Sequence, residues 1–342
     1  MTINNTLRKY MPSMESSAPE VGALEAYEEL RMAIEDLSNL NAVTTELASV
    51  LSTVDEASGI VSVLVDEDRL NNQVLDMYQQ VVTSARDFLG CDVSIVSVES
   101  LASLEVRSLH ISNEAGGFMA KAWDAVVALI KKVYAAIAAI GAKLNPWYKS
   151  NATEAKKLKD EIKDGTVEVP VSPKTVAKAD AIRKDLKENL SKSGKALVTL
   201  TGALSTLEKG QAKNAEILEV VEDAVNELQL GEMGDGTRDK LRDFLTTNDK
   251  PDTDKLLTVA DVDRYFLGDE KEVIQILDDS GAVVKRIEKL AENGKGGAPV
   301  AVAILNAVNT NSRAVTAIAK DNAAIAKKIV SGKRKKEKKG GK

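Results

Sequence analysis

The spacing of apolar residues along the chain predicts a protein built mainly from long α-helices. The clearest pattern spans residues 123–144, where apolar side chains recur at alternating steps of three and four residues, at Trp123, Val126, Ile130, Val133, Ile137, Ile140 and Leu144. This spacing is typical of a heptad seam, and the alanines beside it would let a second helix approach closely. We expect this helix to end at Asn145-Pro146, because proline has no backbone N–H to donate.

Further amphipathic helices are predicted on both sides of this segment. Apolar steps of three or four residues indicate helices over 21–54, 70–88, 152–163, 173–207, 213–230, 270–292 and 298–330. Pro173 suits the first turn of its helix. Thr258-Val-Ala-Asp261 has the pattern of a capping box and predicts a short helix that ends near Leu267. The expected fold is therefore mainly α, with elongated helical hairpins or a coiled-coil-like bundle and at most a few short strands.

Several segments between these helices are expected to be irregular or ambiguous. Residues 60–65, which follow a break at Ser58-Gly59, and residues 93–98 are short apolar runs that fit either a strand or a buried helix. Residues 167–171 are expected to be extended and interrupted by Pro170. The polar segment 1–19 is expected to be disordered, and residues 293–297 to form a flexible connection.

The net charge changes sign within a segment that has no periodicity. His110–Gly117 ends in two glycines, which predicts an exposed linker. Residues 1–114 hold 6 Lys and Arg against 19 Asp and Glu, a net charge of −13, whereas residues 115–342 hold 40 against 33, a net charge of +7. The last twelve residues alone contribute +6. We therefore expect an acidic N-terminal domain over 1–114, a helical body over 115–330 and a disordered basic tail over 331–342.

The inventory of reactive side chains argues against catalysis. His110 is the single histidine and Cys91 the single cysteine. A Ser/His/Asp triad would need His110, whose neighbours form no such pattern, and a zinc site would need more Cys or His ligands. The acidic segment 249–254 lacks the glycine and glutamate of a calcium loop. The sequence predicts neither an enzyme nor a cofactor or metal site, and the chain needs no oxidising compartment.

Basic side chains dominate the last twelve residues, at Lys333, Arg334, Lys335, Lys336, Lys338, Lys339 and Lys342. Because no apolar residue accompanies them, this segment cannot join a core, and it should attract polyanions with a salt-dependent affinity. It has no aromatic residue to stack on a base, so contact with nucleic acid should ignore sequence. The alternative is a solubilising tail with no partner.

The segment around Glu114 resembles a processing signal. Ser112-Asn113-Glu114, followed by Ala115-Gly116-Gly117, is similar to the small-X-Glu signal cut by the maturation proteases of large tailed phages. Ile111 through Glu114 also fits the Ile/Leu-X-X-Glu form of that signal. In its charge organisation the whole chain resembles the internal head proteins of these phages, which carry a cleavable N-terminal propeptide. The resemblance implies that the acidic propeptide helps to load the protein into the prohead core, and that the prohead maturation protease cuts between Glu114 and Ala115.

The resemblance further implies a non-enzymatic virion protein that is made in the host cytoplasm and packaged in the capsid interior. It would contact other head or core proteins, and would contact packaged DNA without sequence preference. The electrostatics agree, because DNA would repel a segment of charge −13 but not a product of charge +7.

Two alternatives remain open. One is a membrane-active, pore-forming-like helical protein that inserts residues 119–144. Lys131 and Lys132 argue against it, because the longest uncharged run is then ten residues and a membrane span needs about 20. The other is an unprocessed helical scaffold or adaptor. A homo-oligomer through helix 119–144 is a further expectation.

Overall fold

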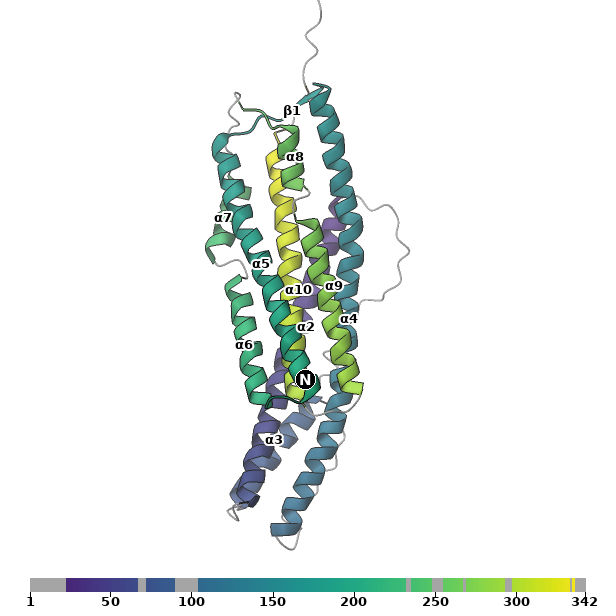
Figure 1. Ribbon diagram of the computed structural model, residues 1–342, viewed down its shortest axis with the longest axis vertical. Coiled ribbons are helices and arrows are strands. Elements are labelled where there is room, and N and C mark those ends of the chain that lie inside the picture. Colours follow the sequence, from purple (N-terminus) through teal and green to yellow (C-terminus); the bar gives the residue numbers. More distant parts are fainter. Residues whose placement is uncertain are drawn as a thin grey trace, which may run out of the picture.

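The computed structural model describes residues 23–66, 72–89, 104–231, 235–247, 255–266, 269–292, 297–332 and 334–335. Within these ranges the chain is mainly α-helical and forms an elongated bundle (Figure 1), which confirms the expected fold class. The helices are α2 (Ala23–Asp66), α3 (Asn72–Leu89), α4 (Leu104–Lys163), α5 (Pro173–Lys209), α6 (Asn214–Gly231), α7 (Asp235–Thr246), α8 (Val259–Phe266), α9 (Glu270–Glu292) and α10 (Ala298–Val330). The described strands are β1 (Val167–Glu168) and β2 (Arg334–Lys335).

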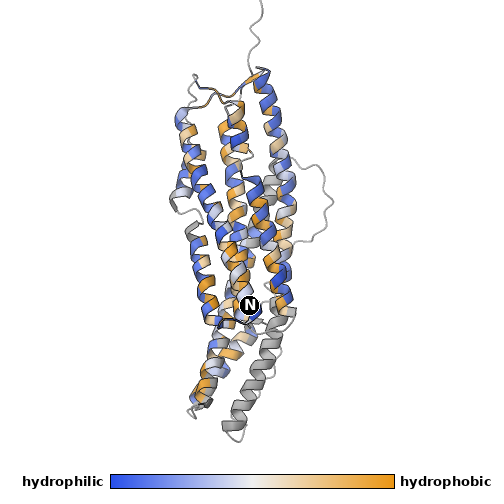
Figure 2. Ribbon diagram, viewed as in Figure 1, coloured by the Kyte–Doolittle hydropathy of each residue, from blue (hydrophilic) through white to orange (hydrophobic). Residues whose placement is uncertain are grey.

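Helix α10 lies at the centre of the bundle. Of its 33 residues, 23 are buried, which is too many for one face, so the helix is enclosed on all sides. It packs against α2, α5, α9, α6, α4 and α8. Figure 2 shows hydrophobic residues predominating along α10, whereas α4 and α5 near β1 are mostly hydrophilic. Its many alanines let these neighbours pack closely around it.

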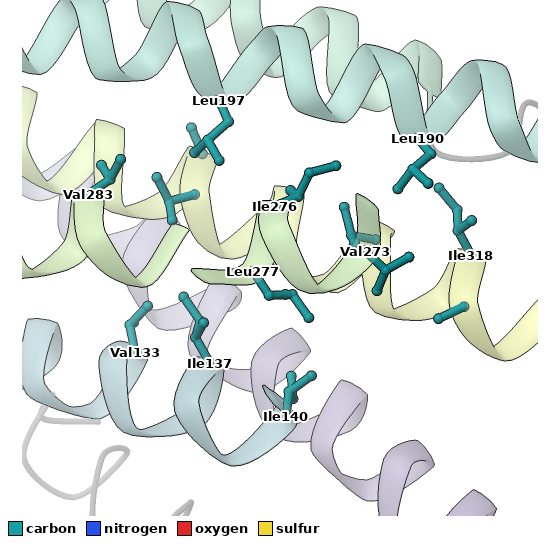
Figure 3. Close-up of a cluster of buried hydrophobic side chains, with 14 of the residues drawn as sticks. Val133, Ile137, Ile140, Leu190, Leu197, Val273, Ile276, Leu277, Val283 and Ile318 are labelled. Carbon is teal, nitrogen blue, oxygen red and sulfur yellow. The ribbon is translucent and has the colours of Figure 1, made fainter. Parts of the chain in front are cut away.

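The heptad seam of α4 faces the interior, as its spacing predicted. Its described members, Ile130, Val133, Ile137, Ile140 and Leu144, are all buried, and α4 packs against α9 and α2. Figure 3 shows Val133, Ile137 and Ile140 on the side of α4 that faces α9, whose Leu277 points back toward α4. The side chains of Trp123 and Val126 lie outside the described residues. The described part of the seam is thus occupied within the protomer.

The predicted end of this helix at Asn145-Pro146 is wrong, because α4 continues through Pro146 to Lys163 and includes the segment expected as a separate helix. A proline inside a helix costs about 3 kcal/mol. The next two residues, Trp147 and Tyr148, are buried, and Ala155 and Leu158 continue the buried stripe. Burial of four such side chains outweighs the lost hydrogen bond.

The predicted break at Ser58-Gly59 is also wrong, since α2 runs unbroken to Asp66 and residues 60–65 are helical. Gly59 is exposed and nothing lies near the position of a Cβ, so the glycine costs only its propensity, about 1 kcal/mol. Leu51 and Val54, one turn or two earlier, are completely buried and hold this part of the helix on the core. The predictions for residues 1–19 and 93–98 lie outside the described residues.

The C-terminal half follows the sequence pattern closely. Helix α5 begins at Pro173, and α9 and α10 have the predicted bounds. The capping box that starts α8 is confirmed, because the backbone N–H and the hydroxyl of Thr258 both donate to Asp261 and the N–H of Asp261 donates to the Thr258 hydroxyl. Helix α7 was not predicted. The glycines at its start obscured its short apolar pattern in the sequence. Leu241 and Phe244 are buried, and α7 packs against α5.

Candidate functional site

The start of the basic tail is held in a small β-structure at one end of the bundle. Arg334 and Lys335 pair antiparallel with Glu168 and Val167. On its other side the segment 167–171 bonds to residues 255–257, with Val171 N–H donating to the Lys255 carbonyl at 3.0 Å and Leu257 N–H donating to the Val169 carbonyl at 2.9 Å. We call segments 167–171, 255–257 and 334–335 the clasp.

The clasp corrects one prediction and confirms another. The extended conformation predicted for 167–171 is confirmed: β1 ends at Glu168, Pro170 forms an isolated bridge with Leu256, and Val167, Val169 and Val171 are buried. The predicted disorder of the whole tail is wrong for Arg334 and Lys335, because the backbone of 167–171 offers them hydrogen-bonding partners. The other basic residues expected to contact nucleic acid, Lys333, Lys336, Lys338, Lys339 and Lys342, lie outside the described residues.

A cavity of about 130 Å³ lies beneath the point where the tail leaves α10. Its polar lining consists of two lysines and four hydroxyl residues, namely Lys178, Lys328, Ser172, Thr175, Thr247 and Ser331. Gly332 is part of the wall and passes so close to the Pro170 carbonyl that an added Cβ would lie 3.1 Å from it. The lining combines positive charge with hydroxyl donors, which suits an anionic oxygen.

The predicted processing segment does not form a linker. Ser112, Asn113, Glu114 and Ala115 lie within α4, and Gly116-Gly117 continue the same helix. The prediction of a non-helical connection is therefore wrong, because the helix-forming residues on both sides outweigh the two glycines. The side chains of this segment lie outside the described residues. Whether Glu114 is a cleavage point stays a prediction.

Helix α2, within the acidic segment before Glu114, packs into the core of the body. The division of the chain into domains at residue 114 stays a prediction. Helix α2 buries a stripe of apolar side chains in the same core as α4 and α10, at Leu40, Val43, Leu47, Leu51 and Val54. Helix α2 is nonetheless strongly acidic, with nine Asp and Glu against one Arg. Helix α2 therefore combines many acidic residues with an apolar face that packs into the core of the bundle.

Polar side chains fix the position of α2 along α10. The Thr44 hydroxyl donates to the Asn306 carboxamide oxygen at 2.8 Å, and the Thr310 hydroxyl donates to the Asn41 carboxamide oxygen at 2.8 Å. Thr44 is completely buried and Thr310 nearly so. A shift of one helical turn would break both interhelical hydrogen bonds, at a cost of about 0.5–1.5 kcal/mol for each bond, and the Thr44 hydroxyl would keep only the Leu40 and Asn41 carbonyls of its own helix. The contact is therefore specific in register.

A second polar cluster joins α5, α8, α9 and α10. The Arg183 guanidinium lies 3.7 Å from the Asp269 carboxylate, which also accepts a hydrogen bond from the Asn322 amide at 2.7 Å. The Tyr265 hydroxyl donates to Asp180 at 2.8 Å, and burial, followed by this hydrogen bond, raises the pKa of Tyr265 to about 12. Burial also lowers the pKa of Arg183, against the pull of Asp269. Because these contacts join residues of several helices, they indicate a structural role.

One buried carboxyl group titrates closer to neutrality. Asp321 lies on α10 with 7% of its surface exposed, and burial raises its pKa from 3.8 to about 6, while Lys320 and Arg238 act in the opposite direction. The sequence did not single out Asp321 or the cluster around Arg183, because their burial arises only from the packing of distant helices.

Among the described residues, no group of three or more His, Cys, Asp or Glu side chains is placed to hold a metal ion. In the same part of the chain, no helix combines the length and apolarity that crossing a membrane requires. Comparisons of this chain with protein families, curated proteins and solved structures found no match.

Proposed function

We propose that this protein is a non-enzymatic structural component of a tailed-phage head, packaged in the capsid interior as a precursor that the prohead maturation protease cuts after Glu114. The observation that carries the proposal is the distribution of charge. Residues 1–114 have a net charge of −13, the rest has +7, and +6 of that belongs to residues 331–342. In the bundle the acidic α2–α3 pair extends toward the end opposite the clasp (Figure 1). One end thus suits DNA and the other repels it.

Cleavage within a helix requires local unwinding, because a helical backbone bonds to itself and cannot enter a protease cleft in extended form. Gly116 and Gly117 lie directly after Glu114 and Ala115. Each glycine makes a helix about 1 kcal/mol less stable than alanine does. Unwinding at this point of α4 therefore costs about 2 kcal/mol less than in an alanine-containing helix. This favours Glu114 over Glu154, which ends a second small-X-Glu sequence, Ala152-Thr153-Glu154, without glycines in the same helix.

Cleavage and release of the propeptide are then two separate steps. Five buried apolar side chains hold α2 on the core, and each contributes about 1.5–3 kcal/mol before entropy is counted. A nicked chain would keep its propeptide until something displaces it. Incoming DNA can displace the propeptide, because its phosphates repel the acidic α2 and attract the basic tail.

The mass of the protein in purified virions tests the proposal. A species that begins at Ala115 supports it, and the fragment 1–114 should be depleted from mature particles relative to proheads. If mature virions contain the full-length chain alone, processing after Glu114 is refuted.

A second candidate is an unprocessed helical scaffold or adaptor. The observation that favours it is the integration of α2 into the core, together with the continuity of α4 through Glu114. Sedimentation of the intact chain from its natural source separates the two. A stable assembly of uncut chains favours the scaffold, whereas uncut monomers that disappear as particles mature favour the precursor.

A further inference from the structure

The clasp gives the basic tail a fixed origin. Helix α10 ends at Val330, and the next two residues, Ser331 and Gly332, form a turn. Arg334 and Lys335 then pair with β1 as an antiparallel strand. The seven residues 336–342 can reach at most about 25 Å from there, at about 3.3–3.6 Å per residue. A polyanion held by these residues therefore lies within about 25 Å of the clasp. The charge of the surface at this end of the bundle therefore determines whether the polyanion is attracted or repelled.

This surface offers positive charge and hydroxyl groups at a single hollow. The cavity next to Ser331 and Gly332 is lined by Lys178 of α5 and Lys328 of α10. Lys178 also contacts the Asp243 carboxylate at 3.3 Å, but both side chains are about half exposed or more. Exposed pairs of this kind contribute little free energy, so a phosphate can compete with Asp243 for Lys178. Lys255 and Arg334, at the clasp itself, are also exposed.

The size of the hollow is compatible with a phosphate group. Its volume of about 130 Å³ corresponds to the liquid volume of about four water molecules. A phosphate group, with five heavy atoms, is small enough to enter this space. The Ser172 hydroxyl can donate to a phosphate oxygen, whereas the hydroxyls of Thr247 and Ser331 donate to the Asp243 and Lys328 carbonyls at 2.7 Å and would have to rotate to do so. None of these contacts reads a base.

We propose that this cavity binds one phosphate of the DNA backbone, between Lys178 and Lys328, while the tail binds neighbouring phosphates of the same duplex. The inference rests on the proposed contact of the tail with DNA and adds a folded subsite to it. The clasp then acts as the joint that keeps the tail and the cavity on one DNA segment. Binding should be independent of DNA sequence.

The test measures binding of the full chain to a short fluorescent duplex at several salt concentrations. Three altered proteins are compared with the original: Lys178→Met/Lys328→Met, the matched control Lys187→Met/Lys195→Met, and a chain that stops at Lys335. Lys187 and Lys195 are exposed on the same helix as Lys178. They lie about 14 and 26 Å further along α5 than Lys178, at 1.5 Å per residue. Both double variants lose the same charge, so a general electrostatic effect moves them equally.

We expect the slope of log affinity against log salt to fall by about 1 in Lys178→Met/Lys328→Met, as for one lost phosphate contact. Affinity at low salt should fall roughly tenfold, and the control should keep the slope of the original protein. Equal changes in both double variants would overturn the subsite. A loss confined to the shortened chain would also overturn it, while leaving the tail contact intact. If the original protein does not bind the duplex, the proposed DNA contact fails as well. The single variant Lys178→Met, at an exposed position, should show part of the effect if the double variant unfolds.

Discussion

Replacing Asp321 by asparagine should stabilise the protein at neutral pH and leave its stability at pH 4 nearly unchanged. The carboxyl group is buried on the central helix, and its folded-state pKa is about 6 against 3.8 for a solvated aspartate. The folded state therefore binds this proton more tightly than the unfolded state does. The site contributes no penalty below about pH 4, and stability is lost as the pH rises through about 6.

The size of the effect follows from the shift. A difference of about two pKa units corresponds to about 3 kcal/mol at 1.36 kcal/mol per unit, an order-of-magnitude value. Asparagine has nearly the same shape and carries no charge, so Asp321→Asn should recover most of this energy above pH 7. In thermal melts the gain should appear as a rise in the midpoint of several degrees.

The assay is a set of urea and thermal unfolding curves, followed by circular dichroism, between pH 4 and 7.5. Asp223→Asn on the exposed side of α6 is the matched control, because it removes the same charge without burial. The gap between Asp321→Asn and the original protein should open between the unfolded pKa of 3.8 and the folded pKa of about 6, and it should reach half its full size at about pH 5. A gap that does not vary with pH, or a variant that is less stable at pH 7, would show that Lys320 and Arg238 compensate the carboxylate and that burial does not dominate.

Three further substitutions test other parts of the structure. Gly116→Ala/Gly117→Ala should slow cutting after Glu114 by a Glu-specific protease roughly 30-fold, since about 2 kcal/mol is added to the cost of unwinding; an unchanged rate would contradict unwinding as the controlling step. Leu47→Ala should lower the free energy of unfolding by about 2–5 kcal/mol in denaturant titrations, because the side chain is fully buried, and a near-zero effect would mean that α2 is not a core helix. Arg183→Met should lower the free energy of unfolding by about 3–5 kcal/mol in the same assay, because it leaves Asp269 without its cation. Adding Asp269→Asn should restore part of this loss. If Arg183→Met does not change the free energy of unfolding, the ion pair does not stabilise the fold.

Much of the fold could be predicted from local spacing. The seam of α4, the start of α5 at Pro173 and the capping box at Thr258 each depend on residues within a few positions of one another, and the structure confirms all three. The local pattern predicted the wrong helix ends where tertiary packing outweighed the effect of a helix-breaking residue. Pro146 and Gly59 both lie in continuous helices, because side chains elsewhere on the same helices, such as Trp147 and Val54, are buried against distant parts of the chain.

The candidate site was harder to predict, since its parts come together only in three dimensions. The basic residues of the tail are plain in the sequence, but nothing there indicates that Arg334 pairs with Glu168 or that Lys178 lies near Lys328. The polar run at 309–312 would ordinarily predict an exposed face. In the structure Asn309, Thr310, Asn311 and Ser312 are buried, because helices surround α10 on every side.

The central position of α10 has a consequence for synthesis of the protein. Thr44 of α2 and its partner Asn306 of α10 are separated by 262 residues. At a translation rate of 5–20 residues per second, α2 waits on the order of ten to fifty seconds before its partner is made. Throughout that interval the apolar stripe of α2 needs temporary cover from other helices or from a chaperone. The bundle can therefore complete its fold only after the ribosome has made α10, which lies near the C-terminus.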